Sequence, residues 1–219
     1  MIDKLPKAAI FDWDNTLVNS LPLVCDAINA TLSYFGLKAD MTVKKVQAQS
    51  QHSAKDLFPR IFGSNSEQAQ KFYYEKYEEL SRNKIIPLPG ALALLKLFAD
   101  QKIYMAIVSN KRGSKLREEV ETLGFTHYFK EVVGSTDCAY DKPSPLCVDR
   151  ALQQFVADVD RKSVWFIGDT MADYLSAIDS ECVPILVADV DGVPVSCAKF
   201  DGCQALEDFC TKLVVQNKK

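Results

Sequence analysis

Short apolar runs that alternate with helical segments constrain the fold of this chain more than any other feature. Runs that fit buried strands occur at residues 8–12, 103–108, 132–133, 164–167 and 185–187. Segments with helical spacing occur at residues 90–100, 114–123, 145–155 and 171–180. Strands that alternate with helices in this way form a parallel sheet with helices on both faces. The sequence therefore predicts an α/β fold with a three-layer core.

The alternation is interrupted once, directly after the first run. Residues 21–82 contain no convincing strand. Helical spacing recurs there at residues 21–35, 43–48, 54–58 and 67–81. We therefore expect a small all-helical domain at residues 19–83, inserted after the first strand. Residues 1–18 and 84–219 are expected to form the core domain.

Composition indicates in which compartment the protein is expected and which classes of partner are not expected. The 219 residues carry a formal net charge of −3, so no broad basic face is expected and nucleic acid is excluded as a partner. No apolar stretch reaches the ~18 residues that a membrane helix needs, and the N-terminus lacks a signal-peptide pattern. The seven cysteines show no C-x-x-C spacing, which is typical of reduced thiols in a cytosolic protein. We expect a cytoplasmic protein without a membrane contact.

Polar residues stand where the predicted strands end. They are Asp12 and Asp14 after the first strand, Ser109 and Asn110 after the second, Lys142 in a later loop, and Asp169 and Asp173 after the fourth. The carboxyl ends of parallel strands meet at one edge of a sheet, and ligands bind at this edge. These residues are therefore expected to form one site.

The residue types at this edge suit phosphoryl transfer. Asp12, Asp14 and Asp169 offer hard oxygen ligands that suit Mg²⁺, and crowded carboxylates need a divalent cation to stay ionised together. Lys142 can hold phosphate oxygens, and the Ser109 hydroxyl can donate a hydrogen bond to one of them. A carboxylate can serve as the nucleophile, while a second carboxylate two residues later moves the proton.

Four motifs together resemble those of the haloacid dehalogenase superfamily. They are Asp12-x-Asp14-x-Thr16, Ser109-Asn110, Lys142-Pro143 and Gly168-Asp169-x-x-x-Asp173. The motifs occur in the order of the superfamily and span nearly the whole chain. The resemblance implies a Rossmann-like core. It also implies a helical cap similar to that of the subgroup containing phosphoglycolate phosphatase and β-phosphoglucomutase.

The resemblance implies a role for each motif residue. Asp12 would be the nucleophile that forms an aspartyl-phosphate, and Asp14 the acid/base. Ser109 would bind phosphate through its hydroxyl and Asn110 through its backbone amide. Lys142 would neutralise the phosphoryl group.

The resemblance also implies how Mg²⁺ is held. The ligands would be Asp12, Asp169 and the backbone carbonyl of Asp14. Thr16 would help to order the loop. Asp173 would bind the metal through water or support the direct ligands from behind.

Asp14 separates the candidate reactions. Dehalogenases of the superfamily resemble this chain but lack the second aspartate and use no Mg²⁺, so Asp14 favours phosphate esters. We expect hydrolysis of a small phosphorylated metabolite, with phosphoglycolate as the candidate by analogy. The alternatives are a phosphosugar mutase and a non-catalytic member that binds phosphate.

The helical insertion is expected to set substrate specificity. Gln51, His52 and Lys55 are the candidate residues. A phosphonatase would need a lysine from this domain, for which Lys44, Lys45 and Lys55 are available.

Two further residues lie beside the motifs. Trp13 is expected to pack in the core. Lys111 is expected either to meet the distal part of the substrate or to be solvated. The chain is expected to be a monomer or a homodimer.

Overall fold

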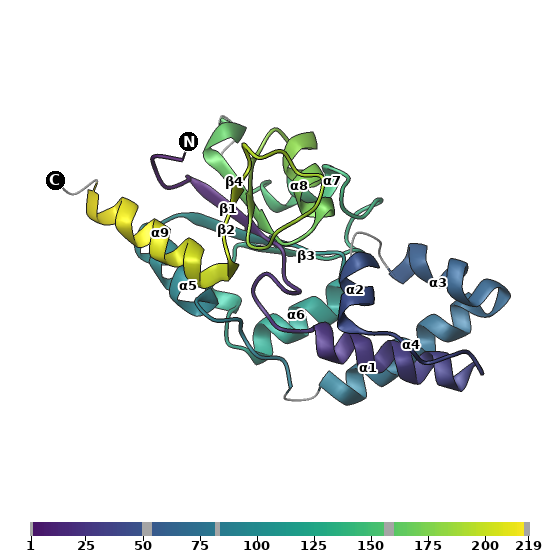
Figure 1. The fold of residues 1–219 in the computed structure, drawn as a ribbon. Helices are drawn as coiled ribbons and strands as arrows, with labels where there is room; N and C mark the ends of the chain where they lie inside the picture. The colour runs from purple at the N-terminus through teal and green to yellow at the C-terminus, as the bar shows by residue number, and fades with distance from the viewer. Residues whose placement is uncertain (1, 50–53, 82–83, 156–159, 217–219) are drawn as a thin grey trace. The chain divides into compact units, whose positions relative to one another are not determined.

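A computed structural model of the chain describes residues 2–49, 54–81, 84–155 and 160–216. The chain divides into two compact units (Figure 1). The larger unit combines Met1–Val18 with Pro87–Lys219, and the smaller unit is Asn19–Ile86. That the smaller unit acts as a cap stays a prediction.

The larger unit contains one six-stranded parallel sheet in the order β3-β2-β1-β4-β5-β6. The strands are β1 (Ala8–Phe11), β2 (Tyr104–Val108), β3 (Glu131–Val133), β4 (Val164–Gly168), β5 (Val183–Leu186) and β6 (Ala198–Lys199). Phe11 at the end of β1 pairs with Ile107 on one side and Ile167 on the other. The residues that follow these three strands therefore emerge at the same edge of the sheet.

Helices cover both faces of this sheet. They are α5 (Ala91–Asp100), α6 (Gly113–Thr122), α7 (Leu146–Ala151), α8 (Met171–Asp179) and α9 (Gly202–Gln216). Figure 1 shows α7 and α8 on one face and α5, α6 and α9 on the other. Ile10 belongs to the core cluster that contains residues of α7 and α8, whereas the adjacent Phe11 contacts Phe98 of α5. Successive residues of β1 thus serve opposite layers, and the predicted three-layer α/β fold is confirmed.

The regular secondary structure of the smaller unit is all helical within its described residues. Its helices are α1 (Leu21–Tyr34), α2 (Val43–Gln49), α3 (Ala54–Phe62) and α4 (Ser66–Ser81). Aromatic rings hold α3 against α4, because Phe58 lies 5.3 Å from Tyr73 between ring centroids and both side chains are buried. The helical spacing seen in this part of the sequence is therefore confirmed.

Three elements differ from the sequence-based expectations. Strand β6 and helix α9 were not predicted. The helix expected at residues 145–155 ends at Ala151, after which the chain turns and Phe155 packs on Tyr104 with ring centroids 4.9 Å apart. Helix α9 packs tightly against the start of α5. A Cβ atom on Gly90 would lie 2.4 Å from the Cα of Gln204.

The state of the cysteines and the character of the helices can be compared with the expectation of reduced thiols and of no membrane helix. All seven cysteines are free, and five are buried while Cys138 and Cys197 are partly exposed. Burial raises the pKa of the Cys203 and Cys210 thiols to about 12, which makes them poor nucleophiles. Within the described part of the chain, no helix combines the length and the apolar character needed to cross a membrane.

Candidate active site

Asp12 and Lys142 form a buried ion pair at the carboxyl edge of the sheet. The register of β1 places Asp12 next to β4, where its backbone amide donates to the carbonyl of Ile167 at 2.8 Å. The Lys142 ammonium lies 2.5 Å from Oδ1 of Asp12 and 2.6 Å from Oδ1 of Asp173. Only 4% of the Lys142 side chain is exposed. The structure thus brings together three residues that the motifs place far apart in the sequence.

Asn110 fixes the loop that carries Lys142. Its side-chain oxygen accepts from the backbone amide of Lys142 at 2.8 Å, and its Nδ2 donates to the Lys142 carbonyl at 3.2 Å. This role of the Asn110 side chain was not predicted. Ser109 is also buried, and its backbone amide donates to the carbonyl of Val133 on β3 at 3.0 Å. Both residues therefore lie at the expected edge, whereas their contacts with phosphate stay predictions.

Asp173 organises the turn between β4 and α8. Its Oδ2 accepts from the backbone amides of Asp169 and Thr170 at 3.2 and 2.9 Å and from the Thr170 hydroxyl at 2.6 Å. Thr170 in turn caps α8 by accepting from the Asp173 amide, which forms a capping box. Glycine is required at position 168, because a Cβ there would lie 2.3 Å from the Cβ of Asp173.

Asp169 completes the carboxylate group. The Thr16 hydroxyl donates to its Oδ1 at 3.0 Å, which links the first motif to the fourth. One oxygen each of Asp12, Asp169 and Asp173 lies within 4.8 Å of the others. Among the described residues the side chain of Asp14 is not part of this group. Its predicted contact with the metal is through the backbone carbonyl and stays a prediction.

The charges of this group are only partly compensated by protein. Burial raises the pKa of Asp12 to about 7 against the opposing effect of Lys142, and Asp173 and Asp14 add to the rise. Burial, Asp12 and Asp173 also raise the pKa of Asp169 well above its usual value. Burial disfavours the Lys142 ammonium, but the two adjacent aspartates outweigh it and raise the lysine pKa. A set of buried carboxylate oxygens with excess negative charge fits a hard divalent cation.

Asp14 is held by residues that the motifs do not include. Lys111 donates to Oδ1 of Asp14 at 2.8 Å and to Oε2 of Glu119 at 2.6 Å. The indole Nε1 of Trp13 donates to the same Glu119 oxygen at 2.8 Å. The expectation that Trp13 is buried is confirmed, and the expectation of a solvated Lys111 is wrong, because 9% of its side chain is exposed. Glu119 was missed, although it follows buried Leu116 by three positions on the apolar face of α6.

The predicted specificity residues are not tested. Gln51 and His52 lie outside the described residues. Lys55 belongs to α3, but its side chain is also outside the described part of the chain. Their role stays a prediction.

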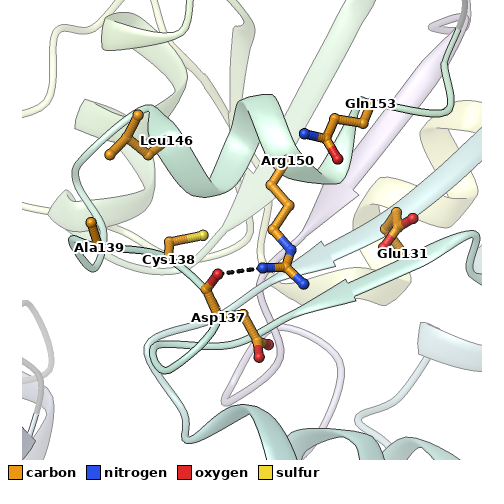
Figure 2. Close-up of a pocket in the computed structure, with 7 residues that line it drawn as sticks. All are labelled: Glu131, Asp137, Cys138, Ala139, Leu146, Arg150 and Gln153. Atoms are coloured by element: carbon orange, nitrogen blue, oxygen red, sulfur yellow. Dashed lines mark hydrogen bonds between the residues drawn. The ribbon is translucent and has the colours of Figure 1, made fainter.

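A separate cavity of about 340 Å³ lies beside α7 and contains none of the predicted site residues (Figure 2). It is lined by Glu131, Asp137, Cys138, Ala139, Leu146, Arg150 and Gln153. Arg150 extends across it and donates to the backbone carbonyl of Asp137. Asp137 also pairs with Arg117 at 2.7 Å. Asp137 at this cavity is therefore bonded twice to other protein groups, through its carboxylate to Arg117 and through its backbone carbonyl to Arg150.

Comparison with known proteins places the chain in a family. The family described as haloacid dehalogenase-like hydrolase matches residues 9–187. A phosphoglycolate phosphatase of Rhodospirillum rubrum is 28% identical, with 94% of this chain and 89% of that protein covered. A phosphoglycolate phosphatase of Pseudomonas fluorescens is 25% identical, with 88% and 74% covered.

A solved structure agrees with these matches. A HAD-superfamily hydrolase from Ehrlichia chaffeensis has a TM-score of 0.67 at 30% identity, with 96% of this chain and 98% of that chain covered. The resemblance inferred from the four motifs and the prediction of a hydrolase are therefore confirmed. The chain belongs to the haloacid dehalogenase-like hydrolase family.

Proposed function

We propose that this protein is a Mg²⁺-dependent phosphatase that hydrolyses a small phosphate monoester through an aspartyl-phosphate on Asp12. The buried pair of Asp12 and Lys142, inside a group of three carboxylates, is the observation that carries the proposal. A carboxylate nucleophile beside a fixed cation can approach an anionic phosphoryl group, which an isolated carboxylate would repel. The names of the related proteins from Rhodospirillum rubrum and Pseudomonas fluorescens support the same reaction.

The first half of the reaction forms the phosphoenzyme. An oxygen of Asp12 forms a bond to phosphorus while the ester oxygen leaves. Lys142, the Ser109 hydroxyl and the backbone amide of Asn110 hold the phosphoryl oxygens. Asp14 gives its proton to the departing oxygen, so the alcohol leaves in its neutral form.

The second half regenerates the enzyme. Asp14, now ionised, takes a proton from water, and the resulting oxygen nucleophile attacks phosphorus and releases inorganic phosphate from Asp12. Mg²⁺, when bound by Asp12, Asp169 and the backbone carbonyl of Asp14, supplies positive charge that offsets the carboxylates and the phosphoryl oxygens. Thr16 and Asp173 keep these ligands and Lys142 in place.

Phosphoglycolate is the proposed substrate, because the curated relatives from both bacteria carry that name. Gln51, His52 and Lys55 are proposed to contact the part of the substrate beyond the phosphate. The enzyme is proposed to act in the cytoplasm as a monomer or homodimer. A phosphosugar mutase of the same family would differ in one measurable respect: it would return the phosphoryl group to a sugar in place of releasing it.

The test is release of inorganic phosphate from phosphoglycolate and from p-nitrophenyl phosphate, with Mg²⁺ and with a chelator. We expect Mg²⁺-dependent release by the wild type and none by Asp12→Asn. Asp189→Asn is the matched control, since the Asp189 side chain is 91% exposed and should leave turnover unchanged. Unchanged turnover in Asp12→Asn would contradict the proposal, as would turnover that does not respond to the chelator.

A further inference from the structure

A buried acid on α6 is not used by the proposed reaction. Glu119 is 3% exposed and lies on the same face of the helix as buried Leu116 and Val120. A buried carboxylate is strongly destabilising unless it is paired and hydrogen-bonded. Glu119 has both kinds of partner, because one of its oxygens accepts from the Trp13 indole at 2.8 Å and from the Lys111 ammonium at 2.6 Å.

The same ammonium reaches the acid/base residue. Lys111 lies 2.8 Å from Oδ1 of Asp14, so a continuous chain of contacts runs from Glu119 through Lys111 to Asp14. Trp13 is adjacent to Asp14 in the sequence, and its indole donates to the same Glu119 oxygen that accepts from Lys111. Two routes therefore connect the Asp14 loop to Glu119 on α6, one through Lys111 and one through the indole of Trp13.

We propose that Lys111 and Glu119 are a positioning pair that orients the carboxyl group of Asp14 for proton transfer. This inference rests on the proposed phosphatase reaction, in which Asp14 protonates the departing oxygen. Lys111 donates to Oδ1 of Asp14, which restricts the direction in which the carboxyl group can point. A fixed carboxyl orientation is needed, because proton transfer depends on hydrogen-bond geometry.

Glu119 explains how Lys111 can orient the carboxyl group of Asp14 by hydrogen bonding. An unbalanced ammonium beside Asp14 would act mainly by its charge. Glu119 balances that charge at 2.6 Å, so Lys111 serves Asp14 mainly as a hydrogen-bond donor of fixed direction. Burial of the Glu119 side chain, of which 4% is exposed, keeps the pair from exchanging with water.

The reactivity of different leaving groups tests this role. Benzyl, phenyl and 4-nitrophenyl phosphate have similar shapes, but their leaving groups are an alcohol, a phenol and an acidic phenol. Only a poor leaving group needs a well-placed proton. The ratio kcat/KM reports the steps up to formation of the phosphoenzyme, in which Asp14 acts as the acid. The dependence of kcat/KM on the leaving group therefore measures how well Asp14 is placed.

We expect Lys111→Met to lower kcat/KM about 100-fold for benzyl phosphate and less than about threefold for 4-nitrophenyl phosphate, with phenyl phosphate between them. Glu119→Gln should lower kcat/KM for the three esters in the same order, with a smaller decrease for each ester than in Lys111→Met. Lys111→Arg keeps a charged donor and should recover part of the loss. Lys111→Met also leaves Glu119 without its cation, so the double variant Lys111→Met/Glu119→Gln provides a folded comparison if the single variant is unstable.

Another lysine–glutamate pair, with both residues on α6, provides the control. Lys115 and Glu118 lie 2.9 Å apart, and 55% of the Glu118 side chain is exposed. Lys115→Met and Glu118→Gln should leave all three kcat/KM values unchanged.

Two results would overturn the inference. One is an equal change, or none, for all three esters in an active Lys111→Met. The other is a rise in KM alone, which would make Lys111 a contact to the substrate. A wild type that hydrolyses none of the three esters with Mg²⁺ would instead overturn the proposed function, and the inference with it.

Discussion

The raised pKa of Asp12 predicts that this carboxylate destabilises the metal-free protein at neutral pH. The pKa of Asp12 rises from 3.8 to about 7, mainly through burial. A carboxyl group with a raised pKa in the folded state contributes stability below pH 4, and that stability is lost as the pH rises through 7. The amide of Asp12→Asn has no ionisable proton and stays neutral, so without metal the variant should become more stable than the wild type as the pH increases.

The size of the effect follows from the shift. A pKa change of about three units corresponds to about 4 kcal/mol. The variant also removes one of the two ion-pair partners of Lys142, although Asp173 remains at 2.6 Å. We therefore expect a net gain of about 1–3 kcal/mol at pH 8, which corresponds to a rise in Tm of several °C for a chain of this size.

Thermal unfolding in a chelator between pH 5 and pH 8 is the assay. The difference in Tm between Asp12→Asn and the wild type should grow with pH, and added Mg²⁺ should reduce it by stabilising the wild type. Asp189→Asn should show a small difference that does not vary with pH. A constant difference, or a variant less stable than the wild type at pH 8, would refute the reasoning.

Three further predictions concern the surroundings of the site. Gly168→Ala should lower the free energy of unfolding, measured by urea denaturation, by about 1–3 kcal/mol, because the new Cβ overlaps Asp173. An unchanged free energy of unfolding would contradict the tight packing at this position. Asn110→Ala removes two hydrogen bonds to the backbone of Lys142 and should lower kcat/KM at least about tenfold, and wild-type kinetics would contradict it. Titration of the native protein with a thiol reagent should modify at most the two partly exposed cysteines quickly; rapid reaction of all seven would contradict their burial.

The carboxyl edge of the sheet could be predicted from the sequence because its geometry follows from topology. Parallel strands that end in polar residues must deliver those residues to one edge. The pairing of Phe11 with both Ile107 and Ile167 shows this directly. Strand order and strand ends are enough to place Asp12 and Asp169 at this edge, whereas Lys142 reaches it from a loop and Asp173 from the first turn of α8.

Contacts between side chains on different elements were harder to predict. The pair of Lys111 and Glu119 depends on which turn of α6 faces the loop after β1, and strand order does not determine this. A signal was present, since Glu119 follows Leu116 at helical spacing on an apolar face. An acid on an apolar helix face requires a buried partner, and the sequence alone did not identify Lys111 and Trp13 as its partners.

The C-terminal elements were missed for two different reasons. Strand β6 contains two residues, which is too short for a periodic pattern. Helix α9 does carry one, because Cys203, Leu206, Cys210 and Leu213 are buried at helical spacing. Two of these four residues are cysteines, whose use as apolar core residues is less evident in a sequence than that of leucine.

The most direct test of the proposed reaction is to trap the phosphoenzyme. Wild-type protein with Mg²⁺ and substrate would be quenched in acid, digested and analysed by mass spectrometry. A phosphoryl group on the peptide that contains Asp12, absent in Asp12→Asn and in chelator, is the predicted result. Turnover of substrate with no phosphoryl group on that peptide, or with the group on another residue, would contradict Asp12 as the nucleophile.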